Sequence, residues 1–426
     1  MVRRIWGAEY RSRRLFALAA AAIVAALGFI AIWGPGQLGE GSGGGASEGA
    51  GSTLGEPGGN QAGDSGREAQ DGVPNESTQS RAGTKEPGAQ QAADPIRLEI
   101  SVSGDILIHS PIYRQALANG DGKYDFRPMF SKIRPVIRGA DLSICHLETT
   151  LTKGAPSSYP IFATPAPLAD AIAATGWDAC STASNHSLDK GLAGIRTTEK
   201  ALNRAGVAHT GSASSSSRSR RAVLLRAGGA KIGLLSYTTM TNGIPLPEPW
   251  SVNLASPKRI LADARRARQR GADAVIVNIH WGTEDSSTID GQQLALAKAV
   301  TKSDVVTALV GQGPHVVQRI AGVNGSRVVF SEGNLLSNQT PSCCARGSQD
   351  GLIALLSIVI RKTGDHLRRV EYIPTWVRHP DFAVLPVGSA ARDGGAPRAV
   401  LRASYQRTVS VAGRGNGVKP IPRRAP

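Results

Sequence analysis

One stretch of this 426-residue chain decides how the rest is interpreted: Ser184-Asn185-His186-Ser187-Leu188-Asp189-Lys190-Gly191. Residues 177–183 before it are typical of a short buried strand, and residues 192–205 after it carry apolar side chains at helical spacing. The stretch is therefore a predicted strand-to-helix loop, and open α/β sheets usually hold ligands at such carboxyl ends of strands. Asn185 and His186 offer an amide oxygen and an imidazole there, and Asp189 can orient the ring or cap the helix. Taken alone, the Asn-His pair also fits an Asx turn with a solvated histidine.

Other predicted strands end in residues of the same kind. Apolar segments predict strands at residues 97–103, 140–147, 274–279 and 305–310, and helical patterns occur at residues 128–138, 257–270 and 292–303. The residues at the strand ends are Asp105, Glu148, Asn185, His186, His280 and His315. Carboxylate, amide and imidazole groups in this mixture suit one or two divalent ions such as Mn, Fe, Zn or Mg. The pattern therefore predicts an α/β domain with a metal site at the strand ends.

Three neighbours of these residues have less definite roles. His109 is a candidate metal ligand, substrate contact or surface histidine. His146 is predicted to be structural or to support a ligand rather than to bind metal itself. Glu284 lies close enough in sequence to His280 to orient its ring.

The composition limits the class of partner. The chain is long enough for one large domain or two ordinary ones. Its formal net charge is +16, but much of the excess lies near the two ends. Such a basic balance suits anionic lipid, a polyanionic polymer or nucleic acid. Because the sequence has no DNA-binding motif and no interleaving of aromatic and basic residues, we predict no nucleic-acid partner.

Both ends of the chain predict segments outside the globular domain, which we place at residues 96–387. Residues 1–14 are basic, and the apolar run 15–33 is long enough to cross a bilayer as a helix. Basic residues before an apolar run predict a single-pass anchor in the cell membrane with an extracytoplasmic main domain. A cleaved signal peptide is the competing interpretation. Residues 34–95, rich in Gly and Ser, predict a disordered linker, and residues 388–426 predict a basic disordered tail.

The four cysteines have no zinc-site spacing. Cys145 and Cys180 lie on predicted neighbouring strands, where buried cysteines are often free and apolar in role. Cys343 and Cys344 lie in a loop. An exported domain permits disulfides, so any bridge is expected to involve the Cys343-Cys344 pair.

The motifs occur in an order that resembles one known family. They are Gly104-Asp105, Leu147-Glu148, the stretch from Ser184 to Gly191, His280-Trp281-Gly282-Thr283-Glu284, Gly311-Gln312-Gly313-Pro314-His315-Val316-Val317-Gln318 and Glu332-Gly333-Asn334. Over residues 98–377 the chain resembles the CapA or poly-γ-glutamate capsule biosynthesis proteins, which are relatives of the calcineurin-like metallophosphoesterases. Members of that family commonly carry an N-terminal membrane anchor, in agreement with residues 15–33.

The resemblance implies a fold and a set of site residues. The fold is a four-layer α/β/β/α metallophosphatase-like sandwich behind the N-terminal helix. The implied metal ligands are Asp105, Glu148, Asn185, His280 and His315. The implied catalytic residues are His186, as general acid or alternatively as a metal ligand, and Asp189. The implied substrate contacts are His109, Glu284, Gln318 and Asn334.

One position departs from the family's pattern. The family usually has His-Pro-His where this chain has Gly313-Pro314-His315, so one imidazole is missing. Glycine has no side chain with which to bind a metal. Either the second metal is weak or absent, or a neighbour such as Gln312 or His109 compensates.

The resemblance also implies a function. The protein would help to make, export or anchor a capsule or cell-envelope polymer of the poly-γ-glutamate type, beside other membrane proteins of capsule synthesis. Its site would act as a metal-dependent hydrolase on a phosphoester or on the anionic polymer. The alternative, which Gly313 favours, is a non-catalytic polymer-binding or assembly subunit with a degraded metal site.

Overall fold

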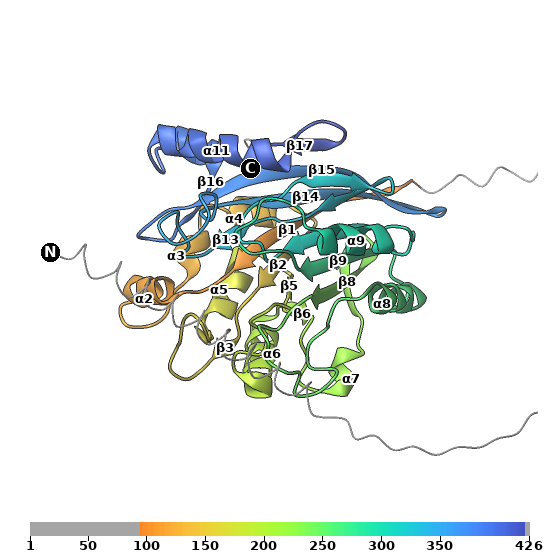
Figure 1. Ribbon diagram of the computed structural model, residues 1–426, viewed down its shortest axis with the longest axis horizontal. Helices are drawn as coiled ribbons and strands as arrows, with labels where there is room; N and C mark the ends of the chain where they lie inside the picture. The colour runs from red at the N-terminus through yellow and green to blue at the C-terminus, as the bar shows by residue number, and fades with distance from the viewer. Residues whose placement is uncertain (1–93, 422–426) are drawn as a thin grey trace, which may run out of the picture. The chain divides into compact units, whose positions relative to one another are not determined.

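The computed structural model describes residues 94–421 (Figure 1). The predicted basic segment, membrane anchor and almost all of the linker, residues 1–93, lie outside the described residues. Within the described range, no helix combines the length and the apolar character that crossing a membrane requires.

The first sheet has nine strands, seven of which follow the order β16-β15-β14-β1-β2-β5-β6. Their bounds are β1 (Ile96–Ile106), β2 (Leu142–Leu147), β5 (Ala179–Ser181), β6 (Ala208–Thr210), β14 (Asp350–Arg361), β15 (Gly364–Val377) and β16 (Val384–Pro386). Two more strands join the sheet beside this path: β13 (Asn334–Leu336) pairs with β1, and β17 (Val418–Pro420) pairs with β15. Strands β1, β2, β5 and β6 are parallel, whereas β14 and β15 form an antiparallel hairpin.

The second sheet has six strands in the order β11-β12-β10-β9-β8-β7. Their bounds are β7 (Val223–Ala227), β8 (Ala230–Thr238), β9 (Ala274–His280), β10 (Ala308–Gln312), β11 (Ile320–Val323) and β12 (Ser326–Val329). The four central strands are parallel, and the edge strands β7 and β11 are antiparallel to their neighbours. A separate short ribbon pairs β3 (Leu151–Thr152) with β4 (Thr164–Pro165).

The two sheets pack face to face, and helices cover both outer faces. The alternation of β9 shows this directly, because Ile276 contacts the first sheet across the inner core, while Val275 and Val277 contact helices. The helices on the first sheet are α2 (Ser110–Asn119), α3 (Arg127–Phe130), α4 (Arg134–Arg138), α5 (Leu168–Thr175) and α6 (Gly191–Ala205). Those on the second sheet are α8 (Pro257–Gln269) and α9 (Gly291–Val300). The predicted four layers, helix, sheet, sheet and helix, are therefore present (Figure 1).

Proline placement explains one difference from the expected helices. Residues 128–138 were expected to form a single helix, but the structure has the two short helices α3 and α4. Each has a proline in its first turn, Pro128 and Pro135. Proline is tolerated there because its missing N–H has no partner in the first turn, whereas inside a continuous helix it removes a hydrogen bond and clashes with the preceding turn.

The C-terminal segment corrects another prediction. Residues 388–426 were expected to form a disordered tail, but residues up to 421 are ordered as α10 (Val387–Asp393), α11 (Arg398–Ala412) and β17. Helix α11 buries Leu401, Thr408 and Val409 against the hairpin β14–β15 and its surroundings (Figure 1). The many arginines and alanines of this segment hid the apolar face that drives its folding.

The cysteines also differ from expectation. Cys145 of β2 lies directly opposite Cys180 of β5, with their Cα atoms 4.5 Å apart, and the two form a disulfide rather than staying free. Cys343 and Cys344 form the second disulfide, as expected. The strand register, which the sequence does not show, brings the first pair together.

Arg407 connects α11 to the sheet. Its Nε and one Nη donate to the Asp350 carboxylate at 2.6 and 3.0 Å, and the Asp350 side chain is only 3% exposed. We expect Arg407→Ala to lower the free energy of unfolding by about 1–3 kcal/mol, because it leaves a buried carboxylate without its partner. Arg402→Ala, at an exposed position of the same helix, should change it by less than about 0.5 kcal/mol. Urea unfolding measures both, and equal effects would contradict this role.

Candidate metal centre

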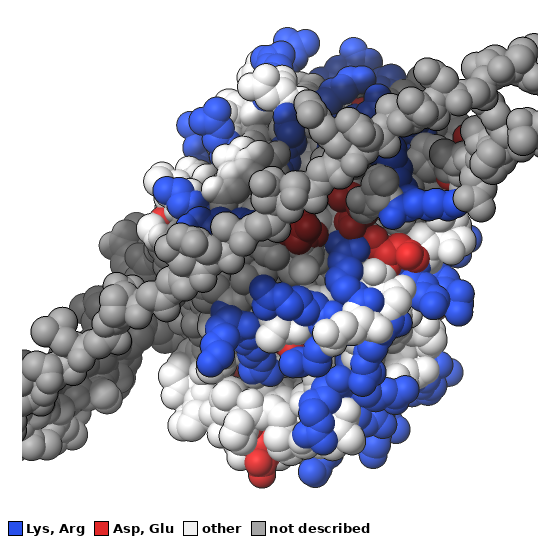
Figure 2. All heavy atoms as spheres, turned by 90° about the vertical axis from the view of Figure 1, so that its right-hand side faces the viewer, with Lys and Arg blue, Asp and Glu red and all other residues white. Residues whose placement is uncertain are grey.

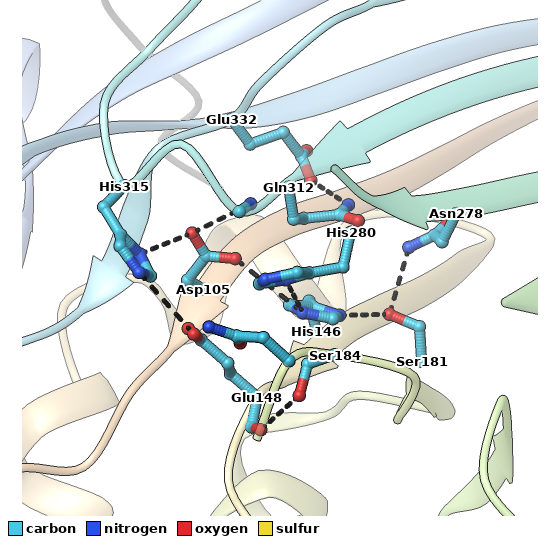
Figure 3. A network of polar contacts seen from close by, with 12 residues as sticks. Asp105, His146, Glu148, Ser181, Ser184, Asn278, His280, Gln312, His315 and Glu332 are labelled. Atoms are coloured by element: carbon cyan, nitrogen blue, oxygen red, sulfur yellow. Dashed lines mark hydrogen bonds and ion pairs between the residues drawn. The ribbon is translucent and has the colours of Figure 1, made fainter. Parts of the chain in front are cut away.

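The carboxyl ends of strands from both sheets meet at one buried cluster of polar side chains (Figure 3). In the first sheet Asp105 of β1 is in register with His146 of β2. In the second sheet Gln312 of β10 is in register with His280 of β9. Parallel strands end at the same edge of a sheet, so packing the two sheets face to face brings these residues together.

Asp105 lies at the middle of the cluster. Gly104 permits this position, because a Cβ there would overlap the carbonyl of Gly333, to which the Asp105 N–H donates at 3.0 Å. One carboxylate oxygen, Oδ2, accepts from the Gly313 N–H at 3.4 Å and lies 3.2 Å from His315 Nδ1. The other, Oδ1, is buried and has no hydrogen-bond partner.

Glu148 and His315 form one side of the cluster. His315 Nε2 lies 3.6 Å from Glu148 Oε1, and both Glu148 carboxylate oxygens are buried without a hydrogen-bond partner. Burial raises the pKa of Glu148 well above its usual range. Burial alone would lower the pKa of His315, but the carboxylates of Glu148 and Asp105 outweigh it and raise that pKa to about 10. Without a metal ion, this side of the site therefore holds a proton.

His146 and His280 form the other side. Their rings stack, with His146 Nε2 3.1 Å from His280 Nδ1 and 3.8 Å from Asp105 Oδ1. Burial lowers the pKa of His146 to about 4 and that of His280 well below its usual range. Both imidazoles are therefore neutral at pH 7, which is the form that binds metals.

The donor set fits divalent ions. Two groups of three side chains, Asp105–His146–His280 and Asp105–Glu148–His315, each have ligand atoms within 4.8 Å of one another, and Asp105 belongs to both. Buried oxygens without hydrogen-bond partners are otherwise costly, and Asp105, Glu148 and Asn185 each supply at least one. Such atoms and neutral imidazoles are the ligands expected for Mn, Fe, Zn or Mg.

The predicted ligands are found close together, with one addition. Asp105, Glu148, His280 and His315 all belong to the two groups. Asn185 donates from Nδ2 to Glu284 at 3.4 Å, and its buried Oδ1 has no partner. His146, for which a structural or supporting role was predicted, is part of the cluster. A signal was present, because His146 and Glu148 are two residues apart and so share one face of the strand.

The predicted catalytic pair is also formed. His186 Nδ1 lies 2.8 Å from Asp189 Oδ2, which also accepts from the Phe162 N–H at 2.7 Å. The ring of Phe162 packs edge-on against that of His186, and both side chains are buried. Asp189 therefore orients the imidazole, as expected.

The four predicted substrate contacts divide into two kinds. Gln318 and Asn334 are fully buried and bonded internally: Gln318 to Gln293, Ser286 and Thr288, and Asn334 to the carbonyls of His315 and Ser348 and to Gln339. These bonds hold the loops around His315, and the buried Asn334 Oδ1 has no hydrogen-bond partner. The role of the two residues as substrate contacts stays a prediction. Glu284 is exposed and bonded to Asn185 rather than to His280. His109 is partly exposed and packs against Phe162, outside both ligand groups.

Glu332 is a further buried acid beside the cluster. Its Oε2 accepts from Gln312 Nε2 at 2.9 Å, and its Oε1 has no partner (Figure 3). Burial raises the pKa of Glu332 to about 8. Glu332 lies in a predicted motif but had no predicted role. Gln312, a possible compensating ligand, is bonded to Glu332 through Nε2, and its buried Oε1 has no hydrogen-bond partner.

Glu332 makes the stability of the metal-free chain depend on pH. Its pKa rises from 4.5 to about 8 on folding, so the folded state holds the proton more tightly and the free energy of unfolding should fall as pH rises through that range. Glu332→Gln should remove this part of the dependence, whereas Glu248→Gln, at an exposed site, should not. Denaturant unfolding in a chelating buffer measures the free energy of unfolding at each pH. If that free energy depends on pH as steeply in Glu332→Gln as in the wild type, the assignment is contradicted.

The comparisons with known proteins agree with these motifs. The family model described as bacterial capsule synthesis protein PGA_cap matches residues 99–339. Capsule biosynthesis protein CapA of Bacillus anthracis is 28% identical over 175 residues, which cover 40% of this chain and 42% of that protein. PGA biosynthesis protein CapA of Bacillus subtilis is 26% identical over 161 residues, covering 37% and 42%. The matched region thus spans less than half the length of these relatives.

Solved structures resemble the chain at low sequence identity. The calcineurin-like phosphoesterase YfkN from Bacillus subtilis is 13% identical, with 74% of this chain and 99% of that chain covered and a TM-score of 0.43. The family assignment depends on the family model, which covers more than half of the 426 residues and contains the whole cluster from Asp105 to His315. This protein is therefore a member of the bacterial capsule synthesis protein PGA_cap family.

Proposed function

We propose that this protein is a membrane-anchored, metal-dependent hydrolase that acts on an anionic polymer or phosphoester of the cell envelope. The observation that carries this proposal is the buried Asp105 carboxylate, which belongs to two groups of metal-binding side chains at once. Sites in which two ions share a ligand are common among enzymes that hydrolyse phosphoesters. The family, whose relatives are named for capsule and PGA biosynthesis, supports a substrate in the envelope.

Different residues of the chain would bind the metal ions and donate a proton in such a reaction. Divalent ions, when bound by Asp105, Glu148, His280 and His315, supply Lewis acidity and lower the pKa of a water molecule. His186 acts as the general acid: Asp189 holds its Nδ1, so Nε2 remains to deliver a proton to the leaving oxygen.

The sequence supports a place at the membrane. Residues 1–33 combine a basic segment with an apolar run of spanning length, and a basic N-terminal flank favours a cytoplasmic start. The catalytic domain would then lie outside the membrane, next to other membrane proteins of capsule synthesis. Such a position gives it access to a polymer as the polymer is exported.

A basic surface favours a second candidate function, a non-catalytic polymer-binding subunit. Figure 2 shows the face that carries α7 (Ser216–Ser219) and α8, where blue side chains outnumber red ones. Its exposed cations are Arg218, Arg220, Arg221, Lys258, Arg265, Arg266 and Arg270. A polycarboxylate is attracted to such a face. This surface is equally useful to an enzyme that holds a long anionic substrate, so catalysis distinguishes the two candidates.

Replacing His186 tests the proposed reaction. We expect the purified full-length chain with Mn2+ or Zn2+ to hydrolyse phosphoesters or poly-γ-glutamate, and His186→Gln to lower kcat by about 10²–10⁴-fold with unchanged metal content, because proton donation is lost. His209→Gln, at a histidine outside the cluster, is the matched control. Metal-loaded protein that binds poly-γ-glutamate but turns over neither substrate would favour the non-catalytic subunit.

A further inference from the structure

We propose that His146 is a metal ligand in this chain, and that with Asp105 and His280 it holds one of the two ions. The inference rests on the proposed function, since it specifies how that site is built. Three independent features support it: the spacing of the ligand atoms, the hydrogen bonds that fix the His146 ring, and the crowding around Gly313, which excludes a side chain there.

The spacing fits one ion. Bonds of about 2.0–2.2 Å to nitrogen and oxygen place neighbouring ligand atoms about 2.8–3.6 Å apart around a tetrahedral or octahedral ion. His146 Nε2 lies 3.1 Å from His280 Nδ1 and 3.8 Å from Asp105 Oδ1. All three side chains are at most 2% exposed. Small side-chain adjustments therefore suffice to turn all three atoms toward a common centre.

The hydrogen bonds around Ser181 fix the tautomer of His146 (Figure 3). The Ser181 hydroxyl donates to the carbonyl of Cys145 at 3.3 Å and accepts from Asn278 Nδ2 at 3.3 Å. Its remaining lone pair faces His146 Nδ1 at 2.8 Å, so Nδ1 must carry the proton and donate it. The lone pair of His146 Nε2 therefore points into the cluster, which is the arrangement that metal-binding histidines usually show.

The Asp105 oxygen nearest to His146 has no hydrogen-bond partner. Its Oδ2 is engaged with Gly313 and His315, whereas Oδ1, the atom nearest to His146 Nε2, is fully buried without a hydrogen-bond partner. A buried carboxylate oxygen without a donor is costly unless a cation meets it.

Gly313 explains why the imidazole comes from β2. The residue has φ +109°, and a Cβ there would lie 2.8 Å from the carbonyl oxygen of Trp281 and 3.1 Å from His280 Nε2. A side chain at position 313 would thus press on the His280 ring and strain the backbone. The chain has no side chain at this position, and His146 approaches His280 from the neighbouring sheet.

Metal stoichiometry tests the inference. The full-length chain is stripped with a chelator, reloaded with Co2+, and its bound metal is measured by elemental analysis and titration. We expect two ions in the wild type and one in His146→Asn, whose amide can still reach Ser181. Ser181→Ala should lower the affinity for one of the two ions by about 10–100-fold, because the His146 ring loses its orienting partner. His209→Asn, on β6 of the same sheet, should keep both ions.

A spectroscopic readout separates ligation from a structural role. The Nδ1 proton of a cobalt-bound histidine gives a paramagnetically shifted, exchangeable signal in proton NMR. One such signal should disappear in His146→Asn. Should His146→Asn fail to fold, Ser181→Ala carries the test. Two ions held with unchanged affinity in either variant would overturn this inference and leave the proposed function standing, whereas a wild type that binds no ion would overturn both.

Discussion

The carboxylate of Asp105 is fully buried between two packed sheets, and the arrangement of the residues around it follows from that burial. A carboxylate removed from water is costly unless charges or hydrogen-bond donors compensate it. Gly313 and His315 compensate Oδ2. The other oxygen, Oδ1, faces the neutral imidazoles of His146 and His280, neither of which donates a hydrogen bond to it. Divalent ions on both sides of Asp105 would supply the missing positive charge, so the metal-free site is only partly compensated.

The fold supplies this arrangement through close backbone contacts. Gly104 allows β1 to lie in contact with the loop at Gly333, and Gly311 allows β10 to lie in contact with Phe330 and Trp281. The indole N–H of Trp281 donates to the Phe330 carbonyl at 2.8 Å. A side chain at Gly104 would push β1 away from Gly333, and one at Gly311 would push β10 away from Phe330 and Trp281. The hydrogen bonds of Gln318 and Asn334 then hold the loop on which His315 sits. The conformation of the site thus depends on residues that do not reach a ligand.

The sequence predicted the location of the site correctly, but it did not reveal many of the contacts that hold the site together. Parallel strands end at one edge, so polar residues after apolar segments correctly predicted that Asp105, Glu148, His280 and His315 would meet. His146 was not among the predicted ligands, although it stands only two residues before Glu148 and belongs to one of the two groups. The internal bonding of Gln318 and Asn334 depends on loop contacts that no local pattern reveals. A disordered tail was predicted where α11 forms because residues 388–426 are rich in Arg, Gly, Ala and Pro. The disulfide of Cys145 with Cys180 depends on strand register.

The central claim is that one carboxylate serves two metal ions, and anomalous X-ray diffraction from Mn2+-loaded crystals tests it most directly. The account predicts two anomalous peaks about 3.5–4 Å apart, both within bonding distance of Asp105, one beside Glu148 and His315 and the other beside His146 and His280. A single peak, or two peaks of which only one contacts Asp105, would contradict it.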